Sequence, residues 1–458
     1  MKVLLVNPPW RHKPKSLWSG ISGVLPPLGL GYLAAMLLKQ GMDVQILDLN
    51  AGRQKTEAFA DFLEGKKFDW IGITATTNLV PAAKRLAQLA RQKMPSAKIV
   101  LGGVHPTILP EEVLNWPEVD YVVRGEGEES IVELVGGKPV ESIRGLSWKK
   151  DGQIVHNPSR EYIPDLDQLP FPAWHLLPVK KYVPALGGYK KLPAVSLITS
   201  RGCSGSCTYC NNFFGQRVRK RSADNVLAEL KMLTREYGIR EIYFYDDSFT
   251  EFPSKVIELC RKMSAEKLNL SWSCFARVNI VNEELLRAMK QAGCHHISYG
   301  IESGSPELLD GIAKKVSLEK IRESVALTKK VGIDILLGFM LGLPGETRET
   351  MEQSLNFALE LDPDMIIFDI TTPFPGTKLY EWAEQHGYLK TRKWDEYDLY
   401  TMVMNLPTVS EQEVREFYSR AYRAFYFRAG YLRKRLLRMR SWLELKQNFQ
   451  AFMLMLKV

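Results

Sequence analysis

Cysteine is scarce in this sequence and unevenly placed. Only six cysteines occur among 458 residues, and three of them, Cys203, Cys207 and Cys210, share one short segment. The other three are scattered, at Cys260, Cys274 and Cys294. A disulfide framework would instead distribute cysteine pairs along a short secreted chain. The pattern therefore excludes a disulfide scaffold and singles out one loop for another use of thiols.

Long apolar runs are also missing. No stretch approaches the ~20 consecutive apolar residues that a membrane-spanning helix needs. The apolar run at the start of the chain is too short for a secretory signal peptide, and no small-residue cleavage site follows it. We therefore expect a cytoplasmic protein, in which reducing conditions keep thiolates available as metal ligands.

Concentrated charge is absent from most of the chain. The formal net charge is +9, but no long basic run breaks the pattern before the C-terminal region. We interpret the dispersed Lys and Arg as solvated surface and expect no nucleic-acid partner. The hydrophobic share of 45% and the charged share of 25% are typical of globular proteins, and the length predicts two or three domains.

Residues 1–147 alternate short β-branched apolar runs with helical patterns. Runs of this kind fit parallel strands that are buried on both faces. The expected strands are Val3–Val6, Val44–Leu47, Trp70–Thr74, Ile99–Leu101 and Tyr121–Val123, and the expected helices include Leu28–Lys39 and Val80–Lys93. Together they predict a doubly wound, flavodoxin-like (Rossmann-type) α/β domain, in which ligands bind beyond the carboxyl ends of the strands.

Three further regions follow. Residues 148–188 are rich in Gly and Pro and are interpreted as a linker, with a short hairpin over Gly145–Val155 that turns at Asp151–Gly152. Residues 189–405 resume the alternation and predict a partial (β/α)6 barrel of the TIM type, with its active site at the C-terminal strand ends. The expected barrel strands are Val195–Thr199, Glu241–Tyr245, Leu270–Phe275, His296–Tyr299, Ile333–Phe339 and Met365–Ile370. Residues 406–458 show only helical patterns.

The cysteine loop follows the first expected barrel strand. Three thiolates bind three irons of a four-iron cubane and leave the fourth open, which is typical of a catalytic centre. Gly202 and Gly205 let the loop fold tightly, and Tyr209 is placed to cover one side of the cluster. The alternative is a zinc site, which nearly always has four ligands. No second Cys-x-x-Cys pair exists, and His295 and His296 belong to another strand.

The spacing Cys-x3-Cys-x2-Cys, with an aromatic residue before the last cysteine, resembles the radical S-adenosylmethionine (SAM) superfamily, and the similarity extends over residues 194–400. The resemblance implies a [4Fe–4S] cluster whose open iron is chelated by SAM, and a 5′-deoxyadenosyl radical made by reductive cleavage. It also implies SAM contacts from the barrel mouth, at Tyr209, Asp246, Arg277, Gly300, Glu302, Gly338 and Gly342. A helix cap is the alternative for the carboxylates among them.

The first domain is similar to the cobalamin-binding domain of one radical SAM subfamily. The matching segments are Asn7–Pro9, Pro26–Ala34, Gly102–Thr107 and Arg124–Glu128. The candidate cobalamin contacts are Asn7, Pro9, Leu28, Gly31, Thr76, Thr77, Gly102, Gly103, His105 and Glu126. A nicotinamide-binding domain is the alternative, but the Gly-x-Gly-x-x-Gly fingerprint is missing after the first strand.

The motif that places an axial histidine under cobalt, Asp-x-His-x-x-Gly, is absent. His105 follows the fourth strand instead, where a capping or phosphate-contacting role is favoured over cobalt ligation. We therefore expect a lower cobalt face that is not held by histidine, a hypothesis that imidazole coordination in the cofactor spectrum would refute.

The positive charge gathers near the C-terminus, where basic and apolar residues alternate. The basic residues are Arg423, Arg428, Arg433, Lys434, Arg435, Arg438 and Arg440, and Trp442, Phe449 and Phe452 follow them. A basic amphipathic helix of this kind indicates contact with a membrane surface, for which the inner membrane surface is the expected place. Packing of its apolar side onto the barrel is the alternative.

The resemblances imply cobalamin-dependent radical SAM methylation of an unactivated carbon, through a 5′-deoxyadenosyl radical and methylcobalamin. A large apolar or lipid substrate would suit the C-terminal region, and flavodoxin or ferredoxin would supply electrons. The chain also resembles the anaerobic magnesium-protoporphyrin monomethyl ester oxidative cyclases, which implies the same cofactors without methyl transfer. A non-catalytic cobalamin sensor or carrier is the alternative outside the enzymes.

Overall fold

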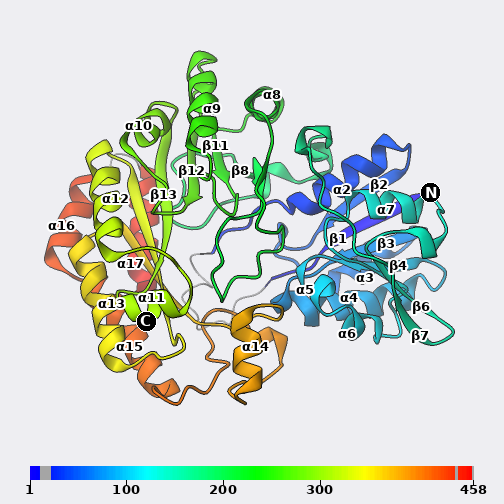
Figure 1. Ribbon diagram of the computed structural model, residues 1–458. Helices are drawn as coiled ribbons and strands as arrows, with labels where there is room; N and C mark the ends of the chain where they lie inside the picture. The colour runs from blue at the N-terminus through cyan, green and yellow to red at the C-terminus, as the bar shows by residue number, and fades with distance from the viewer. Residues whose placement is uncertain (11–21, 439–441, 456–458) are drawn as a thin grey trace.

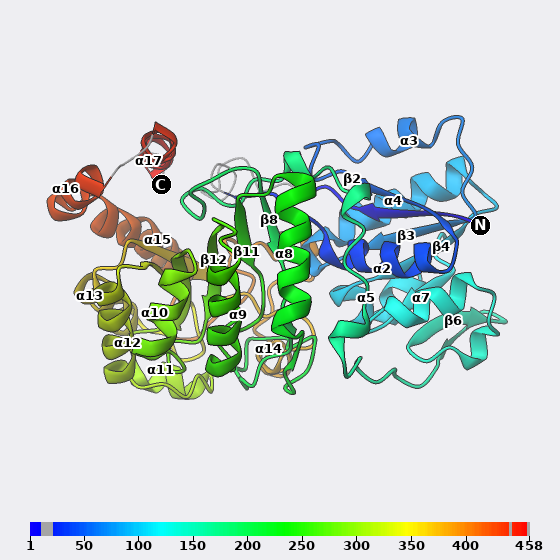
Figure 2. The ribbon, with the colours of Figure 1, turned by 90° about the horizontal axis from the view of Figure 1, so that it is seen from above.

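The computed structural model describes residues 1–10, 22–438 and 442–455. Two α/β units lie side by side (Figure 1), the first built on a mainly parallel sheet and the second on a wholly parallel one. Seen from above (Figure 2), the C-terminal helices lie at the end of the molecule remote from the first unit. The predicted fold class, a flavodoxin-like domain followed by a partial barrel and a helical C-terminal region, is confirmed.

The first sheet has the order β2-β1-β3-β4-β5-β6-β7, and its first five strands in the chain are parallel. The strands are β1 (Lys2–Asn7), β2 (Asp43–Asp48), β3 (Trp70–Thr74), β4 (Lys98–Gly102), β5 (Tyr121–Val123), β6 (Leu146–Lys150) and β7 (Gln153–His156). The helices are α2 (Leu28–Lys39), α3 (Ala58–Leu63), α4 (Val80–Lys93), α5 (Val104–Ile108), α6 (Pro110–Leu114) and α7 (Glu128–Val135), with the 3₁₀ turns η1 (Thr77–Leu79) and η2 (Val140–Ser142). All five predicted strands are present, and both predicted helices have the expected bounds.

Helices cover both faces of this sheet, because alternate side chains of each strand point to opposite sides. On β1, Val3 and Leu5 pack into the core beneath α2 and α7. Leu4 and Val6 pack into the opposite core, beneath α3 and α4. The unbroken apolar run Val3–Val6 is thus explained by burial on both faces.

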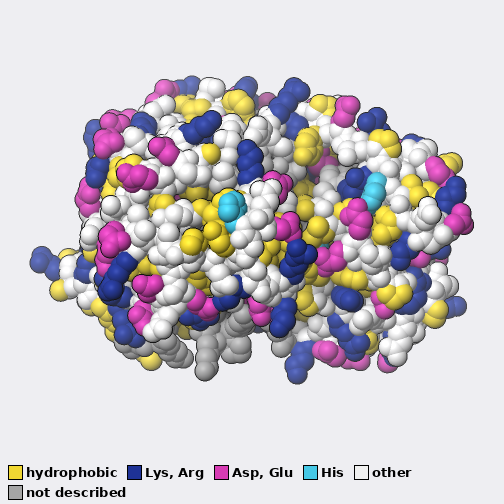
Figure 3. Space-filling model, turned by 60° about the horizontal axis from the view of Figure 1, so that its bottom comes forward, with side chains coloured by type: hydrophobic (Ala, Val, Ile, Leu, Met, Phe, Trp, Pro, Cys, Tyr) yellow, Lys and Arg dark blue, Asp and Glu magenta, His cyan; other side chains and the backbone are white. Residues whose placement is uncertain are grey.

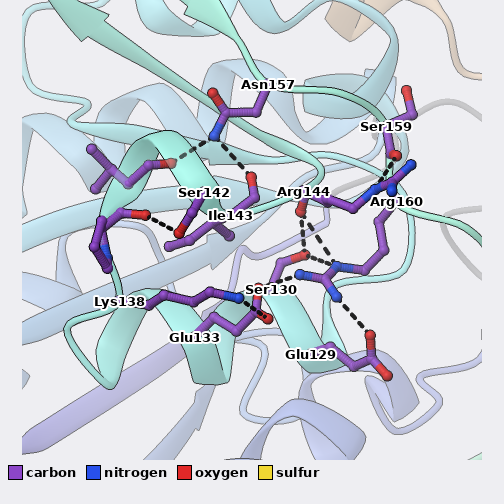
Figure 4. Close-up of polar contacts among 12 residues, drawn as sticks. Glu129, Ser130, Glu133, Lys138, Ser142, Ile143, Arg144, Asn157, Ser159 and Arg160 are labelled. Atoms are coloured by element: carbon purple, nitrogen blue, oxygen red, sulfur yellow. Dashed lines mark hydrogen bonds and ion pairs between the residues drawn. The ribbon is translucent and has the colours of Figure 1, made fainter.

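The predicted hairpin is present, but it is an edge of the first sheet. β6 pairs antiparallel with β5 and β7, and Asp151 and Gly152 have the positive φ angles that its two-residue turn needs. The expected boundary at residue 147 therefore divides the hairpin, and the sheet continues to His156. Arg160 fastens the chain that follows (Figure 4): its Nε donates to Ser130 Oγ at 2.9 Å and its Nη1 pairs with Glu129 on α7.

The second sheet has the order β15-β14-β13-β12-β11-β8, with every pair parallel. Its strands are β8 (Ala194–Leu197), β11 (Glu241–Phe244), β12 (Ser271–Ala276), β13 (Cys294–Glu302), β14 (Asp334–Leu341) and β15 (Met365–Ile370). The helices are α8 (Ala223–Tyr237), α9 (Pro253–Ala265), α10 (Glu283–Gln291), α11 (Pro306–Gly311), α12 (Leu318–Val331), α13 (Arg348–Leu361) and α14 (Lys378–Gln385). The six strands form the predicted partial barrel, and their carboxyl ends share one side.

The C-terminal region consists of α15 (Glu411–Tyr426), α16 (Ala429–Arg438) and α17 (Trp442–Met455). α15 packs along the free edge of β15, where the Tyr422 hydroxyl meets the backbone N–H of Phe368 at 3.1 Å and the Tyr426 hydroxyl meets that of Ile366 at 3.0 Å. Packing onto the barrel therefore accounts for α15. Arg440, part of the predicted basic segment, lies outside the described residues. No helix within the described ranges is long and apolar enough to cross a membrane.

The first domain takes part of its core from the segment after the barrel. Trp394 and Tyr397 are buried in the cluster that lies beneath α4. The Trp394 indole N–H donates to Glu112 at 2.7 Å, and its ring meets the His105 ring edge-on, with centroids 5.2 Å apart. The two domains are therefore joined at the back of the first sheet by contacts remote from the linker.

Candidate active site between the two domains

The three thiols lie in a loop closed by a short antiparallel pair. β9 (Ser200–Arg201) pairs with β10 (Arg219–Lys220), so the intervening chain returns to its starting point. Gly202 has a φ of 97°, and an added Cβ would lie 2.8 Å from the carbonyl oxygens of Gly215 and Arg217. This position requires glycine, because the loop ends pass each other too closely for a side chain.

The thiols are free and accessible to a ligand. Cys203 and Cys207 are partly buried, and Cys210 is exposed. The Gly205 N–H points at the Cys203 sulfur at 3.4 Å. No three His, Cys, Asp or Glu side chains in the described ranges are placed to hold one metal ion. In a cubane the three protein ligands bind three different irons, so the thiols need not converge on one metal ion.

Arg277 approaches this loop from the end of β12. Its Nη1 lies 3.5 Å from Ser204 Oγ, and a Cβ at Gly205 would lie 2.8 Å from the same nitrogen. A glycine at 205 therefore leaves room for a guanidinium beside the cysteines. An anionic group bound at the open iron would meet this cation, as the sequence predicted for the SAM carboxylate.

Glu302 forms a polar cluster beside the cysteine loop. Its Oε1 accepts from the Tyr209 hydroxyl at 2.8 Å and from Lys314 Nζ at 2.7 Å. The bulge between Gly300 and Glu302 turns this side chain into the site, and any Cβ at Gly300 would collide with the carboxylate. Burial and the neighbouring carboxylate raise the pKa of Tyr209 well above its ordinary value. No sequence motif marks Lys314, which lies in the segment after α11.

Asp246 and Asp247 accept hydrogen bonds from the residues that lead into the cysteine loop. Asp246 accepts from the Thr199 N–H at 3.1 Å and from its hydroxyl at 2.7 Å, and also from the Ser200 hydroxyl. Asp247 accepts from the Gly202 N–H at 3.1 Å. These bonds connect Asp246 and Asp247 to the start of the cysteine loop, and the predicted SAM contact of Asp246 stays a prediction.

The remaining predicted SAM contacts lie on β14 and just beyond it. Gly338 leaves the middle of the barrel wall open, because the atom nearest to an added Cβ would be 3.9 Å away. Gly342 has a φ of 81° at the carboxyl end of the strand. Across from Met340, Asp369 on β15 has a buried Oδ1 with no hydrogen-bond partner among the described residues. Burial, and then the charge of Glu302, raise the pKa of Asp369 to about 7.

A cavity of about 170 Å³ opens at the carboxyl ends of the first sheet. Its lining is mostly apolar and includes Gly102, Gly103 and Glu126, three of the predicted cobalamin contacts. Gly29, Leu30, Tyr32 and Leu33 of the matching segment Pro26–Ala34 also line the cavity. Ile198, Phe213 and Phe214, which the sequence did not single out, complete this part of the lining. At Gly103 an added Cβ would lie 2.8 Å from the Ala75 carbonyl oxygen. The glycine-lined space beside the sheet fits the nucleotide tail of cobalamin, which supports the predicted group.

The other predicted cobalamin residues do not line this cavity. Asn7 donates to Asp48 at 2.8 Å. His105 is fully buried, with Nδ1 3.4 Å from Thr77 Oγ1 and Nε2 3.7 Å from Glu112. This burial fits the favoured non-ligand interpretation of His105. The remaining four lie outside the lining as well: Pro9, Leu28, Gly31 and Thr76.

Buried ion pairs connect the cavity wall to the cysteine loop. Arg201 pairs with Glu126 at 2.8 Å and with Glu128 at 2.6 Å, and Arg219 pairs with Glu126 at 2.9 Å. All four side chains are at least nine-tenths buried. Arg201 precedes Cys203 by two positions, so the first domain fixes the start of the loop that carries the thiols. The Arg201 guanidinium also lies over the Tyr32 and Phe214 rings.

Comparison with known proteins identifies both domains. The B12 binding domain family matches residues 17–135, and the Radical SAM superfamily matches residues 197–358. The uncharacterized methyltransferase PH0819 of Pyrococcus horikoshii is 39% identical over 95% of this chain and 94% of its own length. The chain belongs to the cobalamin-dependent radical SAM methyltransferase family. The cobalamin-binding and radical SAM domains predicted from the sequence are therefore confirmed.

Other members of the wider group are more distant. The anaerobic magnesium-protoporphyrin IX monomethyl ester cyclase of Cereibacter sphaeroides is 29% identical over 93% of this chain and 71% of its own length. Among solved structures, the radical S-adenosylmethionine methyltransferase TsrM from Kitasatospora setae superposes with a TM-score of 0.69 at 22% identity. That match covers 85% of this chain and 76% of TsrM, and it confirms the two-domain architecture.

Proposed function

We propose that this member of the family methylates an unactivated carbon of a large apolar substrate. The observation that carries the proposal is the shared wall between the two candidate cofactor sites. Arg201 lines the cobalamin cavity, and the cysteine loop begins two positions later. A carbon held at the barrel mouth would then face both cofactors. Methyl transfer requires this geometry, because the carbon must be within reach of the radical derived from SAM and of the methyl group on cobalamin.

The side chains present have separate tasks in this proposal. Cys203, Cys207 and Cys210 would hold the [4Fe–4S] cluster, and Arg277 would pair with the SAM carboxylate. Glu302 would accept from the ribose hydroxyls, with Lys314 and Tyr209 fixing its orientation. When bound, the cluster with SAM supplies a carbon-centred radical, and cobalamin supplies the methyl group.

The inner surface of the barrel supports an apolar substrate. Tyr243, Tyr245 and Phe275 form an aromatic group on neighbouring strands, with centroids between 5.2 and 5.4 Å apart. Tyr245, which directly follows β11, is 48% exposed and offers an apolar ring surface to a ligand. Asp369 supplies a carboxyl group with an unpaired oxygen on the opposite side. An apolar ligand with one polar group would match this lining.

The decisive experiment follows the methyl group. Anaerobically reconstituted protein is incubated with cobalamin, a chemical reductant, methyl-labelled SAM and a total lipid extract. The proposal requires S-adenosylhomocysteine and 5′-deoxyadenosine to form together, and label to enter one lipid product that gains one methyl. Formation of 5′-deoxyadenosine without S-adenosylhomocysteine would favour the cyclase-like alternative. Absence of both products would favour a sensor or carrier.

The partners and the location are also proposals. A flavodoxin or ferredoxin would supply electrons in the cytoplasm, and the C-terminal helices would contact the inner membrane surface. On the face shown in Figure 3, basic and acidic side chains are interspersed and form no continuous basic stripe. α16 and α17 expose large apolar side chains instead, among them Leu437 at 75% and Trp442 at 81%. Exposed apolar side chains of this size are typical of a surface that binds a membrane or another protein.

A further inference from the structure

An apolar chamber of about 370 Å³ lies near the amino-terminal ends of β14 and β15, between the barrel and α15–α17. The thiols follow the carboxyl end of β8, at the opposite end of the sheet. Aliphatic and aromatic side chains make up most of the lining, among them Leu336, Ile367, Tyr431, Leu445 and Phe452. Its volume falls in the range of ligand sites, which is ~300–1,000 Å³.

A basic pocket of about 350 Å³ adjoins this chamber. The two share five lining residues: Gly187, Met365, Arg435, Gln447 and Asn448. Five cationic side chains line the pocket, Lys190, Lys290, Lys329, Lys434 and Arg435, against two carboxylates, Asp334 and Asp364. The carboxylates already have partners, since Asp334 pairs with Lys190 at 3.5 Å and Asp364 accepts from the Ile335 N–H at 3.0 Å. The pocket therefore has an excess of positive charge.

Gln447 lies at the junction of the two spaces. Its side chain is 6% exposed, and its Nε2 has no hydrogen-bond partner among the described residues. A buried amide donor without a partner is costly, so such groups commonly mark a ligand or an ordered water. This observation is independent of the charge excess and indicates an acceptor at the same place.

We propose that the paired chambers bind one anionic phospholipid of a membrane, with an acyl chain in the apolar chamber and the phosphate in the basic pocket. Exposed apolar side chains on α16 and α17, the helices that line the chamber, favour a bilayer as the source: Leu436, Leu437, Trp442 and Phe449 are between 65% and 81% exposed. A free fatty acid would leave these side chains in water, whereas a bilayer covers them.

The site is distinct from the methyl-transfer site. β14 has eight residues, which span ~26 Å at the usual rise of a strand. A lipid held at the amino-terminal end of this strand is therefore separated from the thiols by most of the barrel. The inference goes beyond the proposed function and assigns this lipid an anchoring role.

The test measures co-sedimentation of the full-length protein with phosphatidylcholine vesicles, with and without phosphatidylglycerol. We expect at least tenfold tighter binding to the anionic vesicles. The double variant Lys290→Gln/Arg435→Gln should lose that advantage. The matched control Lys255→Gln/Arg261→Gln removes the same charge from exposed positions on α9 and should bind as the wild type does. Equal losses in both double variants would overturn the proposal, because they would indicate attraction by net charge alone.

Two further variants test the chamber itself. Ala451→Trp fills it and should weaken binding to anionic vesicles at least tenfold. Unchanged binding would overturn the proposed acyl site and leave only surface contact by α16 and α17. Gln447→Leu should raise the melting temperature of the lipid-free protein, because it removes the unpaired amide, while weakening vesicle binding. A fall in melting temperature together with unchanged binding would also contradict the proposal. None of these outcomes depends on methyl transfer.

Discussion

Arg201 Nη1 and Glu126 Oε1 lie 2.8 Å apart at a position that both domains bury. The carboxylate belongs to the rim of the cobalamin cavity, and the guanidinium belongs to the strand that leads into the cysteine loop. Arg219, on the strand that closes this loop, shares the same carboxylate. One side chain of the first domain thus fixes both ends of the cluster loop.

Removal of that carboxylate should be costly. Glu126→Ala leaves two guanidinium groups in the interface short of a partner, and loss of one partner from a buried pair costs about 3–5 kcal/mol. We expect a melting temperature several degrees lower and weaker retention of both cofactors. Glu323→Ala, which breaks an exposed pair with Lys320, serves as the control and should change stability by at most about 0.5 kcal/mol.

Each thiol of the loop should be required for the cluster. Cys203→Ala, Cys207→Ala and Cys210→Ala should each reduce iron and sulfide in anaerobically reconstituted protein to background, because a cubane with two protein ligands is poorly held. Cys260→Ala removes a buried thiol of α9 and should keep the full iron content. If the triple variant bound zinc as tightly as the wild type does, the assignment of these thiols as the metal ligands would be contradicted.

A larger side chain at Gly29 can fill the cobalamin cavity without strain. This residue lies in the first turn of α2, and an added Cβ would have no atom within 4 Å. Gly29→Leu should retain or raise the melting temperature, since leucine favours a helix over glycine by up to about 1 kcal/mol. Its Kd for cobalamin should rise at least tenfold. Gly430→Leu, at another helical glycine with open space around it, should leave cobalamin binding unchanged.

Glu302 should contribute to SAM affinity. A hydrogen bond to a charged group is worth about 1.5–3 kcal/mol, so Glu302→Gln should raise the Kd for SAM roughly 10- to 100-fold in cluster-loaded protein. Iron content must stay at the wild-type level for this interpretation. Glu307→Gln, at an exposed position on α11, provides the comparison. Equal affinity in the two variants would show that the carboxylate does not contact the nucleoside.

Asp369 should make the apo protein less stable as the pH rises. Its pKa is raised in the folded state from 3.8 to about 7, so between these values the folded protein binds a proton that the unfolded chain has released. Stability attributable to this group is therefore present below about pH 4 and is lost as the pH rises to about 7. Asp369→Asn should remove this loss, so that its melting temperature exceeds that of the wild type increasingly from pH 4 to pH 7. A constant difference across this range would refute the shift.

Local patterns in the sequence were sufficient to predict most of the fold. Trp70–Thr74 and Leu28–Lys39 have the predicted bounds because apolar runs and helical periodicity are properties of consecutive residues. The place of the hairpin was not predictable in this way. Its own residues specify the turn, but its pairing with β5 depends on an edge that only the assembled sheet presents.

The candidate site shows the same division. The three cysteines lie in one short segment, so the loop could be predicted directly as the cluster site. Lys314 and Arg201 carry no local motif. Their roles arise from contacts with Glu302, 12 residues away, and with Glu126, 75 residues away. The place of Asp246 at a strand end predicts a SAM contact, but its hydrogen bonds with Thr199 and Ser200 follow no local pattern and appear only in the fold.

Trp394 and Tyr397 make the flavodoxin-like unit dependent on a segment more than two hundred residues downstream of its own last strand. A fragment ending at His156 would lack both aromatic side chains and would leave the ring of His105 beside an open hole. Exchange of barrels between relatives, by recombination or by design, should therefore succeed only when this aromatic pair is transferred in register with the α/β unit that it completes.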